Sequence, residues 1–368
     1  MNGVRKLVNQ IEYEEKERWR ETLEQFEQRD VYNYLEYLEA FKRHGDGLPL
    51  MIYGEHDNTK FCNIVMKRDI TDTDIFSRAF SKDEWFDIIT PYGYGGIIFD
   101  NPNEISIKIL REEYQDYCRQ KNIISEFVRF HPVCKNHILG EKFFDVKQIG
   151  PTVLMDLSSQ KTIWDNLESK NRNMIRKAKK NGVKIYMGRS PGLFTYFHQM
   201  YDETMRRDKA QEYYYFKDDF YESILDDLVN KSVIFYAEYE NQIIAMAIIL
   251  LGNRQLHYHL SASHRKFANL APTNLLLYEV AVWGAENGFR TFHLGGGLGG
   301  RQDSLFNFKK AFNRRLYSRF YIGKQIYNLE MYQYLCDMRR DTGVTDNYFP
   351  LYRMPKQESS YEKDGIVD

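Results

Sequence analysis

The sequence predicts an α/β (α+β) protein of two domains in tandem, each a mixed, mainly antiparallel sheet flanked by helices. The chain has 368 residues and 43% hydrophobic content, enough to fill two cores. Short alternating apolar runs, typical of strands, are interspersed with longer stretches of helical period. The order strand meander, buried helix, strand occurs twice along the chain. We interpret this repetition as a structural duplication.

The first half begins with residues 5–29, which are charged and free of Gly and Pro and predict a helix with one apolar side. A second helix is expected from Asp30 to Gly45. The segments LPLMIYGEHD and KFCNIVMKRDI predict paired strands, and WFDIITPYGYGGIIF predicts a strand broken by a bend. A helix over 104–120 and the strand IISEFVRFHPV, which Pro132 ends, complete this half.

The second half repeats this order with the strand TVLMDL, a helix over 161–182, the strand VKIYMG, two helices and a strand meander over 232–263. The next helix, TNLLLYEVAVWGAENG, is apolar nearly all round, which predicts that it is buried. The first domain, with its N-terminal helix, is expected to cover 1–150 and the second 151–322. Residues 323–368 form a C-terminal segment that we expect to pack back on the first domain and to fray at its end.

The charge balance excludes a global attraction for polyanions, because 51 Lys and Arg residues face 52 Asp and Glu residues. We expect no DNA partner. The N-terminus lacks the apolar stretch of a signal peptide, and the longest apolar run, 243–251, is about half a membrane span. These features predict a cytoplasmic protein without a transmembrane segment. The four cysteines are scattered, which predicts neither a metal site nor a disulfide framework.

The segment LGGGLGGRQD raises the question of a dinucleotide site, because Gly295, Gly297 and Gly300 match GxGxxG. The motif lies near the C-terminus and not in a first βαβ unit, and no acidic residue follows about 20 residues on. Arg301 stands where a phosphate-binding Walker loop requires Lys. We therefore expect no nicotinamide or ATP site.

The helix SLFNFKKAF follows this loop. Leu305, Phe308 and Phe312 are spaced i, i+3, i+7 and are expected to face the core. Lys309 lies beside this face and is a candidate to point into a cleft, although helix geometry alone would leave it a surface lysine.

From TPYGYGG through SEFVRFHP, KNRNMIRKAKKNGV and YDETMRRD to WGAENGFRTFHLGGG and SLFNFKKAF, the chain resembles Fem-type peptidoglycan aminoacyltransferases. The resemblance spans about residues 30–322 and implies two GNAT-like domains in tandem, with the acyl-transfer site in the second. Members of this family take an amino acid from aminoacyl-tRNA and form an amide on a peptidoglycan precursor, UDP-MurNAc-pentapeptide or lipid II.

The resemblance assigns catalysis to Phe308 and Lys309. Amide formation passes through a tetrahedral intermediate whose oxyanion needs a positive partner, and Lys309 is the expected charge stabiliser. The sequence shows no Ser/His/Asp or Cys/His arrangement, which fits a mechanism without a covalent enzyme intermediate.

Further residues match the family's acceptor-binding positions. Thr204 and Arg206 match a Thr-x-Arg pair, and arginine suits phosphate or carboxylate because its planar fork donates two hydrogen bonds. Tyr258 matches a tyrosine near the reacting groups. His257 and His259 flank it, and for both we favour a structural role over that of a general base.

In the first half, Tyr92 and Tyr94 lie on a glycine-rich bend that allows close ligand approach, so we interpret them as acceptor contacts. Arg129 and His131 share one face of a strand. They either line the same cleft or pair with core carboxylates.

A basic helical stretch has Arg172, Arg176 and Lys180 at every fourth position, so one face is positive. It could track the backbone of a tRNA, or simply be a solvated face.

No cofactor is expected beyond the acyl donor, aminoacyl-tRNA or acyl-CoA. The segment HRKFANLAP before the buried helix lacks the glycines with which GNAT enzymes hold CoA, and this favours the tRNA. The alternatives are an acyl-CoA-dependent N-acyltransferase on an amino sugar of a polysaccharide precursor, and a non-catalytic binding relative. A lipid-linked acceptor would imply peripheral contact with the inner membrane face.

Overall fold

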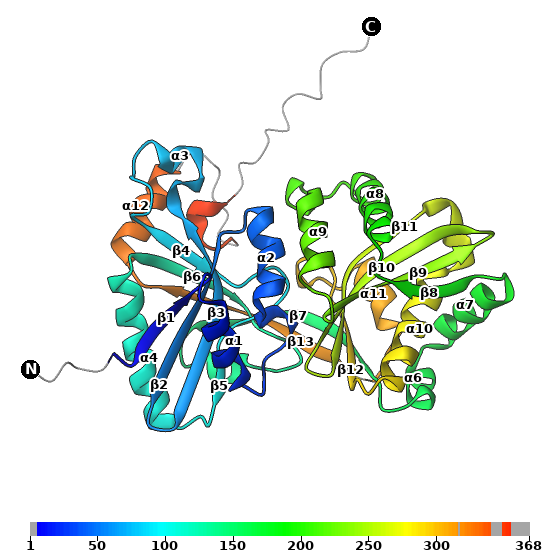
Figure 1. The fold of residues 1–368 in the computed structure, drawn as a ribbon, viewed down its shortest axis with the longest axis horizontal. Coiled ribbons are helices and arrows are strands. Elements are labelled where there is room, and N and C mark those ends of the chain that lie inside the picture. Colours follow the sequence, from blue (N-terminus) through cyan, green and yellow to red (C-terminus); the bar gives the residue numbers. More distant parts are fainter. Residues whose placement is uncertain (1–5, 316, 340–347, 355–368) are drawn as a thin grey trace, which may run out of the picture.

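A computed structural model of the protein describes residues 6–315, 317–339 and 348–354. Within this part of the chain, one sheet of 13 strands extends across two halves, with helices on both of its faces (Figure 1). The strand order is β1-β2-β3-β4-β6-β13-β7-β12-β11-β10-β9-β8, and β5 pairs with β3. The ladders are antiparallel except for β4 with β6 and β11 with β12. The predicted mixed, mainly antiparallel architecture is confirmed.

The first half contains these elements: β1 (Val8–Glu12), α1 (Lys16–Glu24), α2 (Leu35–His44), β2 (Leu48–His56), β3 (Thr59–Asp69), α3 (Asp74–Ser77), β4 (Phe86–Ile89), β5 (Ile98–Asp100), α4 (Glu104–Gln120), β6 (Ile123–Arg129) and α5 (His137–Gly140). The loop between β4 and β5 is the predicted Gly/Tyr bend.

The second half contains β7 (Asp145–Asp156), α6 (Gln160–Asn166), α7 (Ser169–Lys180), β8 (Lys184–Gly188), α8 (Pro191–Arg207), α9 (Asp218–Asp226), β9 (Ser232–Tyr239), β10 (Gln242–Gly252), β11 (Gln255–Ser263), α10 (Pro272–Glu286), β12 (Thr291–Gly295) and α11 (Ser304–Lys310). The chain then continues through β13 (Tyr317–Ile326) and α12 (Leu329–Met338). As predicted, α10 is buried on most of its surface.

Backbone hydrogen bonds join the two halves without a break. Strand β13 returns from the second half and inserts between β6 and β7 (Figure 1). Residue 150, where we placed the domain boundary, lies inside β7. Helix α12 contacts β6 of the first half, where Tyr332 and Leu335 pack with Ile124. The expected frayed end, residues 355–368, lies outside the described residues.

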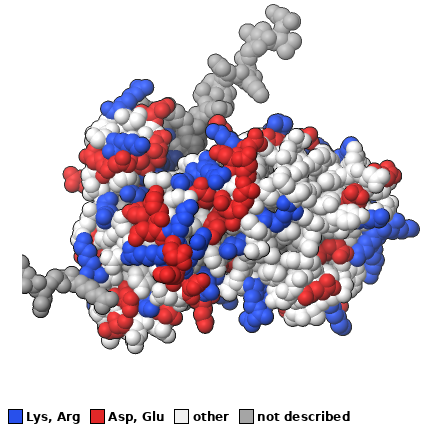
Figure 2. Space-filling model, in the orientation of Figure 1, with Lys and Arg blue, Asp and Glu red and all other residues white. Residues whose placement is uncertain are grey.

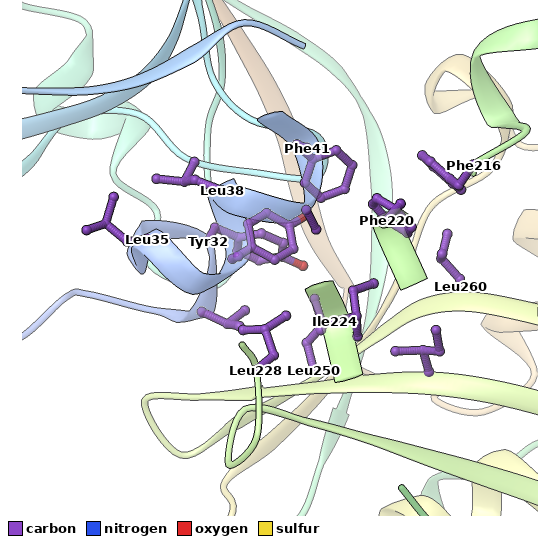
Figure 3. Packing of buried hydrophobic residues seen from close by; sticks show 14 of the residues in the cluster. Tyr32, Leu35, Leu38, Phe41, Phe216, Phe220, Ile224, Leu228, Leu250 and Leu260 are labelled. Carbon is purple, nitrogen blue, oxygen red and sulfur yellow. The ribbon is translucent and has the colours of Figure 1, made fainter. Parts of the chain in front are cut away.

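One hydrophobic cluster also spans both halves (Figure 3). Side chains from α2 pack against side chains from α9 and its flanks, and β10 and β11 contribute from below. The cluster's labelled members are Tyr32, Leu35, Leu38, Phe41, Phe216, Phe220, Ile224, Leu228, Leu250 and Leu260. The halves therefore share a core as well as a sheet.

Three local predictions are wrong. Residues 8–12 form the edge strand β1 and not a helix, because they pair in antiparallel register with β2. The helix expected over 161–182 is broken at Leu167 and Glu168, which are extended because the Glu168 amide donates to the carbonyl of Ala311. Leu305 is exposed, and Phe306 takes the expected core position because α11 starts at Ser304 under an Asp303 cap.

The shared core predicts that the halves unfold together. Phe220 is fully buried and its ring packs against those of Phe41 and Phe216, at 5.2 and 4.1 Å between centroids. Phe220→Ala should lower the free energy of unfolding by about 3–5 kcal/mol, from lost transfer energy and the cavity left behind. Urea unfolding followed by circular dichroism should show one transition. Leu298→Ala, at an exposed site, is the control. Two separate transitions would contradict a shared core.

Candidate active site where β11 and β12 part

The parallel strands β11 and β12 pair only over 255–257 and 291–293, ending at His257 and His293. Beyond this pair each strand carries a bulge, which leaves His259 extra on β11 and Leu294 extra on β12. Bulges bend strands, so β11 continues beside β10 while β12 ends beside β7. We call the place where the strands diverge the fork. Past His257, β11 has a strand partner on one side only within the described residues.

Lys309 of α11 reaches the fork from the glycine loop side. Asp303 caps α11 by accepting from the amide of Phe306, and its other oxygen accepts from the amide of Leu298, which ties the loop to the helix. The buried Nζ of Lys309 donates to the carbonyl of Gly296 at 2.8 Å. No other described residue is hydrogen-bonded to Nζ, so two of its three N–H groups are available.

Gly295 leaves the space beside this ammonium group open. A Cβ there would lie 3.3 Å from Nζ of Lys309 and 3.9 Å from the hydroxyl of Tyr94, and its φ of +78° also favours glycine. The glycine loop is thus a structural segment that makes room beside a cation.

Burial alters the chemistry of the fork. Desolvation lowers the pKa of Lys309 to about 8, which Asp303 only partly offsets. The Tyr258 ring centroid lies 5.9 Å from Nζ, and burial raises the pKa of this phenol to about 12. At neutral pH the fork therefore holds a mainly charged lysine beside an uncharged tyrosine. The second residue predicted to be catalytic, Phe308, is partly buried against Phe312.

The bend between β4 and β5 brings the first half to the fork. The Tyr94 ring packs against His293 and Phe320, at 5.2 and 5.7 Å between centroids. Tyr92 stacks on Phe41, and its carbonyl accepts from the hydroxyl of Tyr37. The structure thus places Tyr94 at the fork and Tyr92 in the adjoining aromatic cluster.

Arg129, the last residue of β6, lies near both tyrosines. Burial raises the pKa of each phenol, and the positive charge of Arg129 opposes this effect in part. The guanidinium stacks over Phe127 at 5.1 Å. None of the described residues gives it a hydrogen bond or an ion pair. Of the two alternatives, Arg129 is therefore a free, half-buried cation, whereas its neighbour His131 pairs with a carboxylate.

Thr204 and Arg206 do not lie at the fork. The hydroxyl of Thr204 donates to the Met200 carbonyl and accepts from the amide of Ser263, the last residue of β11. The exposed Arg206 pairs with Asp202 at 3.3 Å on the same helix. In this structure Thr204 has a packing role and Arg206 faces solvent.

The basic stretch occupies α7 at the right-hand edge of the molecule (Figures 1 and 2). Two of the three predicted cations make contacts within their own half of the molecule. Arg172 turns back to the Leu167 carbonyl at 2.6 Å, and Arg176 lies over the Trp164 ring at 5.1 Å. Lys180 is exposed, and no described residue pairs with it.

Sequence reasoning missed a buried polar cluster between the halves. Oδ2 of Asp30 lies 2.9 Å from Nε2 of both His131 and His257, and its Oδ1 accepts from the amide of Val31. The β10–β11 turn packs closely here, because a Cβ at Gly252 would lie 2.1 Å from Oδ1. The capping box of Asp30 with Asn33 was a visible signal for a helix start only. The pairing with histidines 101 and 227 residues away had no local signal.

Asp30, His131 and His257 could in principle hold a metal ion. The hydrogen bonds to Nδ1 of His131 argue against a metal ion at these three residues. Nδ1 accepts from the amides of Val133 and Cys134, both at 3.2 Å, so the proton is on Nε2, which donates to Asp30. A metal-bound Nε2 would instead require a proton on Nδ1.

The Asp30 cluster gives a stability prediction. Burial alone would raise the pKa of Asp30, but the two histidines outweigh it and hold the pKa well below the usual range. In Asp30→Asn an amide replaces the carboxylate, so the two histidine N–H groups would face either its N–H₂ group or its oxygen, which accepts more weakly. The free energy of unfolding should fall by about 3–5 kcal/mol at pH 7.

A carboxyl with a depressed pKa stabilises the fold above its unfolded pKa and loses this effect as the pH falls toward its folded pKa. The difference between wild type and Asp30→Asn should therefore shrink below about pH 4. Urea titrations at several pH values measure it. A difference that does not depend on pH would contradict the ionised state of the Asp30 carboxylate.

Comparisons with known proteins bear on the fold. Residues 168–310 match the acetyltransferase (GNAT) domain family. None of the curated protein sequences matches the chain. The structure of FemX superposes with a TM-score of 0.65 at 13% identity, covering 89% of this chain and 99% of that one. A C-terminal domain named for lysylphosphatidylglycerol synthetase, from Agrobacterium fabrum, superposes with a TM-score of 0.52 at 14% identity, covering 85% and 92%.

In the described part of the chain, every helix is too short or too polar to cross a bilayer. The likeness to FemX covers both halves, and the family match covers the half that contains the fork. The chain therefore has the fold of FemX, and residues 168–310, in its second half, match the acetyltransferase (GNAT) domain family.

Proposed function

We propose that the protein is an aminoacyltransferase that forms an amide on the amine of a peptidoglycan precursor, with aminoacyl-tRNA as the donor. The observation that carries the proposal is the buried ammonium group of Lys309 at the fork, with two N–H groups unused. In a site shielded from water, such a cation interacts strongly with charge that develops during a reaction.

The fork suits an activated acyl group. When an amine attacks the ester carbonyl of the donor, the carbonyl oxygen becomes an oxyanion, and Lys309 can donate to it. An acyl carbonyl lying beside β11 could also meet backbone amides that have no strand partner on that side. Gly295 leaves room for the reacting atoms.

Arg129 is the best anchor for an anionic acceptor. Its unpaired guanidinium can grip a phosphate or carboxylate in two hydrogen bonds, beside the tyrosines that adjoin the fork. A nucleotide- or lipid-linked precursor carries such phosphates. This transfers the acceptor-binding role that we first assigned to Arg206 to the first half of the molecule.

Helix α7 supports the choice of tRNA as donor. Lys180 and Lys177 are exposed, and no described residue pairs with them. Their charge would be matched by phosphates of an RNA backbone. Arg176 over Trp164 adds a flat cationic surface at the same place.

A second candidate is an acyl-CoA-dependent N-acyltransferase on an amino sugar. Helix α10 begins at Pro272 after Ala271, which gives no side-chain cap, so the amides of its first turn are open to a phosphate. The exposed Arg265 and Lys266 lie in the preceding turn.

One assay separates these candidates. Purified protein is incubated with charged tRNA and UDP-MurNAc-pentapeptide or lipid II, and in parallel with acetyl-CoA and glucosamine phosphate. Mass spectrometry then reports the product. A mass gain of one amino-acid residue supports the proposal, and acetylation of the sugar supports the second candidate. Binding of precursor without any product would identify a non-catalytic relative.

Lys309→Ala should reduce kcat by about 100- to 1,000-fold, as for loss of an oxyanion donor, with the melting temperature retained. Lys310→Ala, the adjacent residue of α11, is the matched control and should transfer at the wild-type rate. Near-normal turnover by Lys309→Ala would contradict the role of the ammonium group.

The charged form of Lys309 is lost as the pH rises through its pKa of about 8. The wild-type kcat should therefore decline above pH 8. In a Lys309→Arg variant that retains activity, the decline should move to higher pH, because arginine stays charged. A kcat that rises steadily to pH 10 in the wild type would show that Lys309 acts in its neutral form.

Arg129→Gln should raise KM for a phosphorylated acceptor by about 10-fold or more, as expected for a lost charge-assisted pair, with a smaller effect on kcat. Arg119→Gln, at an exposed arginine of the same half, is the control. Isothermal calorimetry with the acceptor alone checks binding directly. An unchanged KM would place the anion elsewhere.

A further inference from the structure

We propose that His293, which lies beside the pair of Asp30 and His257, accepts the proton which the acceptor amine must lose. This rests on the proposed function and adds a catalytic residue to it. His293 was not among the residues that the sequence singled out.

His293 lies at the base of the fork, directly opposite His257 in the strand register. The two ring centroids are 6.1 Å apart. On its other side His293 meets Tyr94, whose hydroxyl lies 3.9 Å from the position of a Cβ at Gly295, beside Nζ of Lys309. The imidazole is thus a close neighbour of the space that we assign to the reacting atoms.

Three imidazole nitrogens in this region are buried without a hydrogen-bond partner among the residues that the structure describes: Nδ1 of His257, Nε2 of His259 and Nε2 of His293. An unpaired buried polar atom destabilises the folded state, so native proteins contain few of them. Three on neighbouring strands, one of them close to Lys309, are better explained by a ligand with N–H groups than by packing. A primary amine supplies such donors.

The charge state of these rings fits the role of proton acceptor. Burial, His257, His131 and Lys309 lower the pKa of His293 well below its ordinary value, so its ring is neutral and has a lone pair to offer. His257 donates from Nε2 to the Asp30 carboxylate, which fixes its tautomer and leaves Nδ1 as an acceptor.

A weakly basic imidazole is sufficient for this step. An ammonium group entering the site meets the same desolvation as Lys309 and the repulsion of its charge, so it sheds its first proton to water. The neutral amine then attacks the donor carbonyl carbon and a C–N bond forms. The nitrogen of this adduct is now positively charged and strongly acidic.

His293 takes that second proton as the adduct forms. When the adduct collapses, the C–O bond of the donor ester breaks, and the proton passes to the leaving oxygen. The products are an amide and an alcohol, and His293 is neutral again. No oxidant, metal or covalent enzyme intermediate is required.

Tyr94 covers His293 in the structure, so the amine reaches it when this side chain moves. Tyr94 lies between Gly93 and Gly95, and both Gly93 and Gly96 have positive φ, at +87° and +88°. The backbone of this bend is held at Gly95, whose amide donates to the Arg129 carbonyl and whose carbonyl accepts from Asn136, so the opening is a rotation of the Tyr94 side chain. Hydrogen bonds from the amine to the unpaired imidazole nitrogens offset part of the free energy needed to move the Tyr94 side chain.

The test compares His293→Gln with wild type for kcat and KM between pH 6 and 9, on the acceptor found above and on hydroxylamine. His198→Gln, at a surface histidine paired with Asp218, is the matched control. We expect His293→Gln to lose about 100-fold in kcat on the natural acceptor, as for a general base, with KM little changed. Asp30, His131, His257 and Lys309 face His293, so the variant's pH profile is read against that of Lys309→Ala.

The defect should be much smaller with hydroxylamine, whose adduct loses its proton readily to water, and should lessen as the pH rises. Equal losses on both acceptors at every pH would show a purely structural role and overturn the proposal. So would near-normal turnover by His293→Gln while Lys309→Ala is inactive, which leaves the proposed function intact. A wild-type protein that transfers to no acceptor overturns both. His293→Asn replaces the glutamine variant if the latter does not fold.

Discussion

The divergence of β11 and β12 after a single short ladder is the constraint on which the site depends. Two bulges, at His259 and Leu294, bend the strands apart just past the His257–His293 pair. The divergence leaves β11 unpaired on one side, and Lys309 enters beside Gly295. Had the ladder continued, neighbouring strands would satisfy the same backbone groups and no cation could lie between them. A local irregularity of the sheet thus creates the chemical environment.

The fork is completed from the first half, which explains why the two halves are fastened together so firmly. Strand β13 joins their sheets, the cluster around Phe220 joins their cores, and Asp30 binds a histidine from each half. Tyr94 and Arg129 reach the fork region only in this arrangement. The relative position of the halves therefore sets the distance between an anion at Arg129 and the carbonyl at Lys309.

Much of the fold could be predicted from the hydrophobic periodicity of the sequence and from the prolines and glycines at the ends of its elements. The apolar helix α10, between Pro272 and Gly288, and the meander before it are both found where they were predicted. The errors lie where tertiary contacts outweigh local preference, as in β1 and at Glu168. At the site, the family resemblance indicated Lys309, whereas helix geometry alone would have left it a surface lysine. No local pattern could reveal that His131, His257 and Asp30 meet, since these residues are far apart in the sequence. Nor could it reveal that Arg206 pairs with Asp202, since this depends on the orientation of the two side chains on their helix.

The central claim is that the Lys309 ammonium group is held in a desolvated setting at the fork and still carries a proton at neutral pH. A direct test is an NMR titration of the lysine side chains, with the Lys309 signal assigned from its loss in Lys309→Arg. We predict a midpoint near 8 for Lys309, set by burial against the Gly296 carbonyl. A midpoint of about 10.4, the pKa of an ordinary exposed lysine, would contradict the claim.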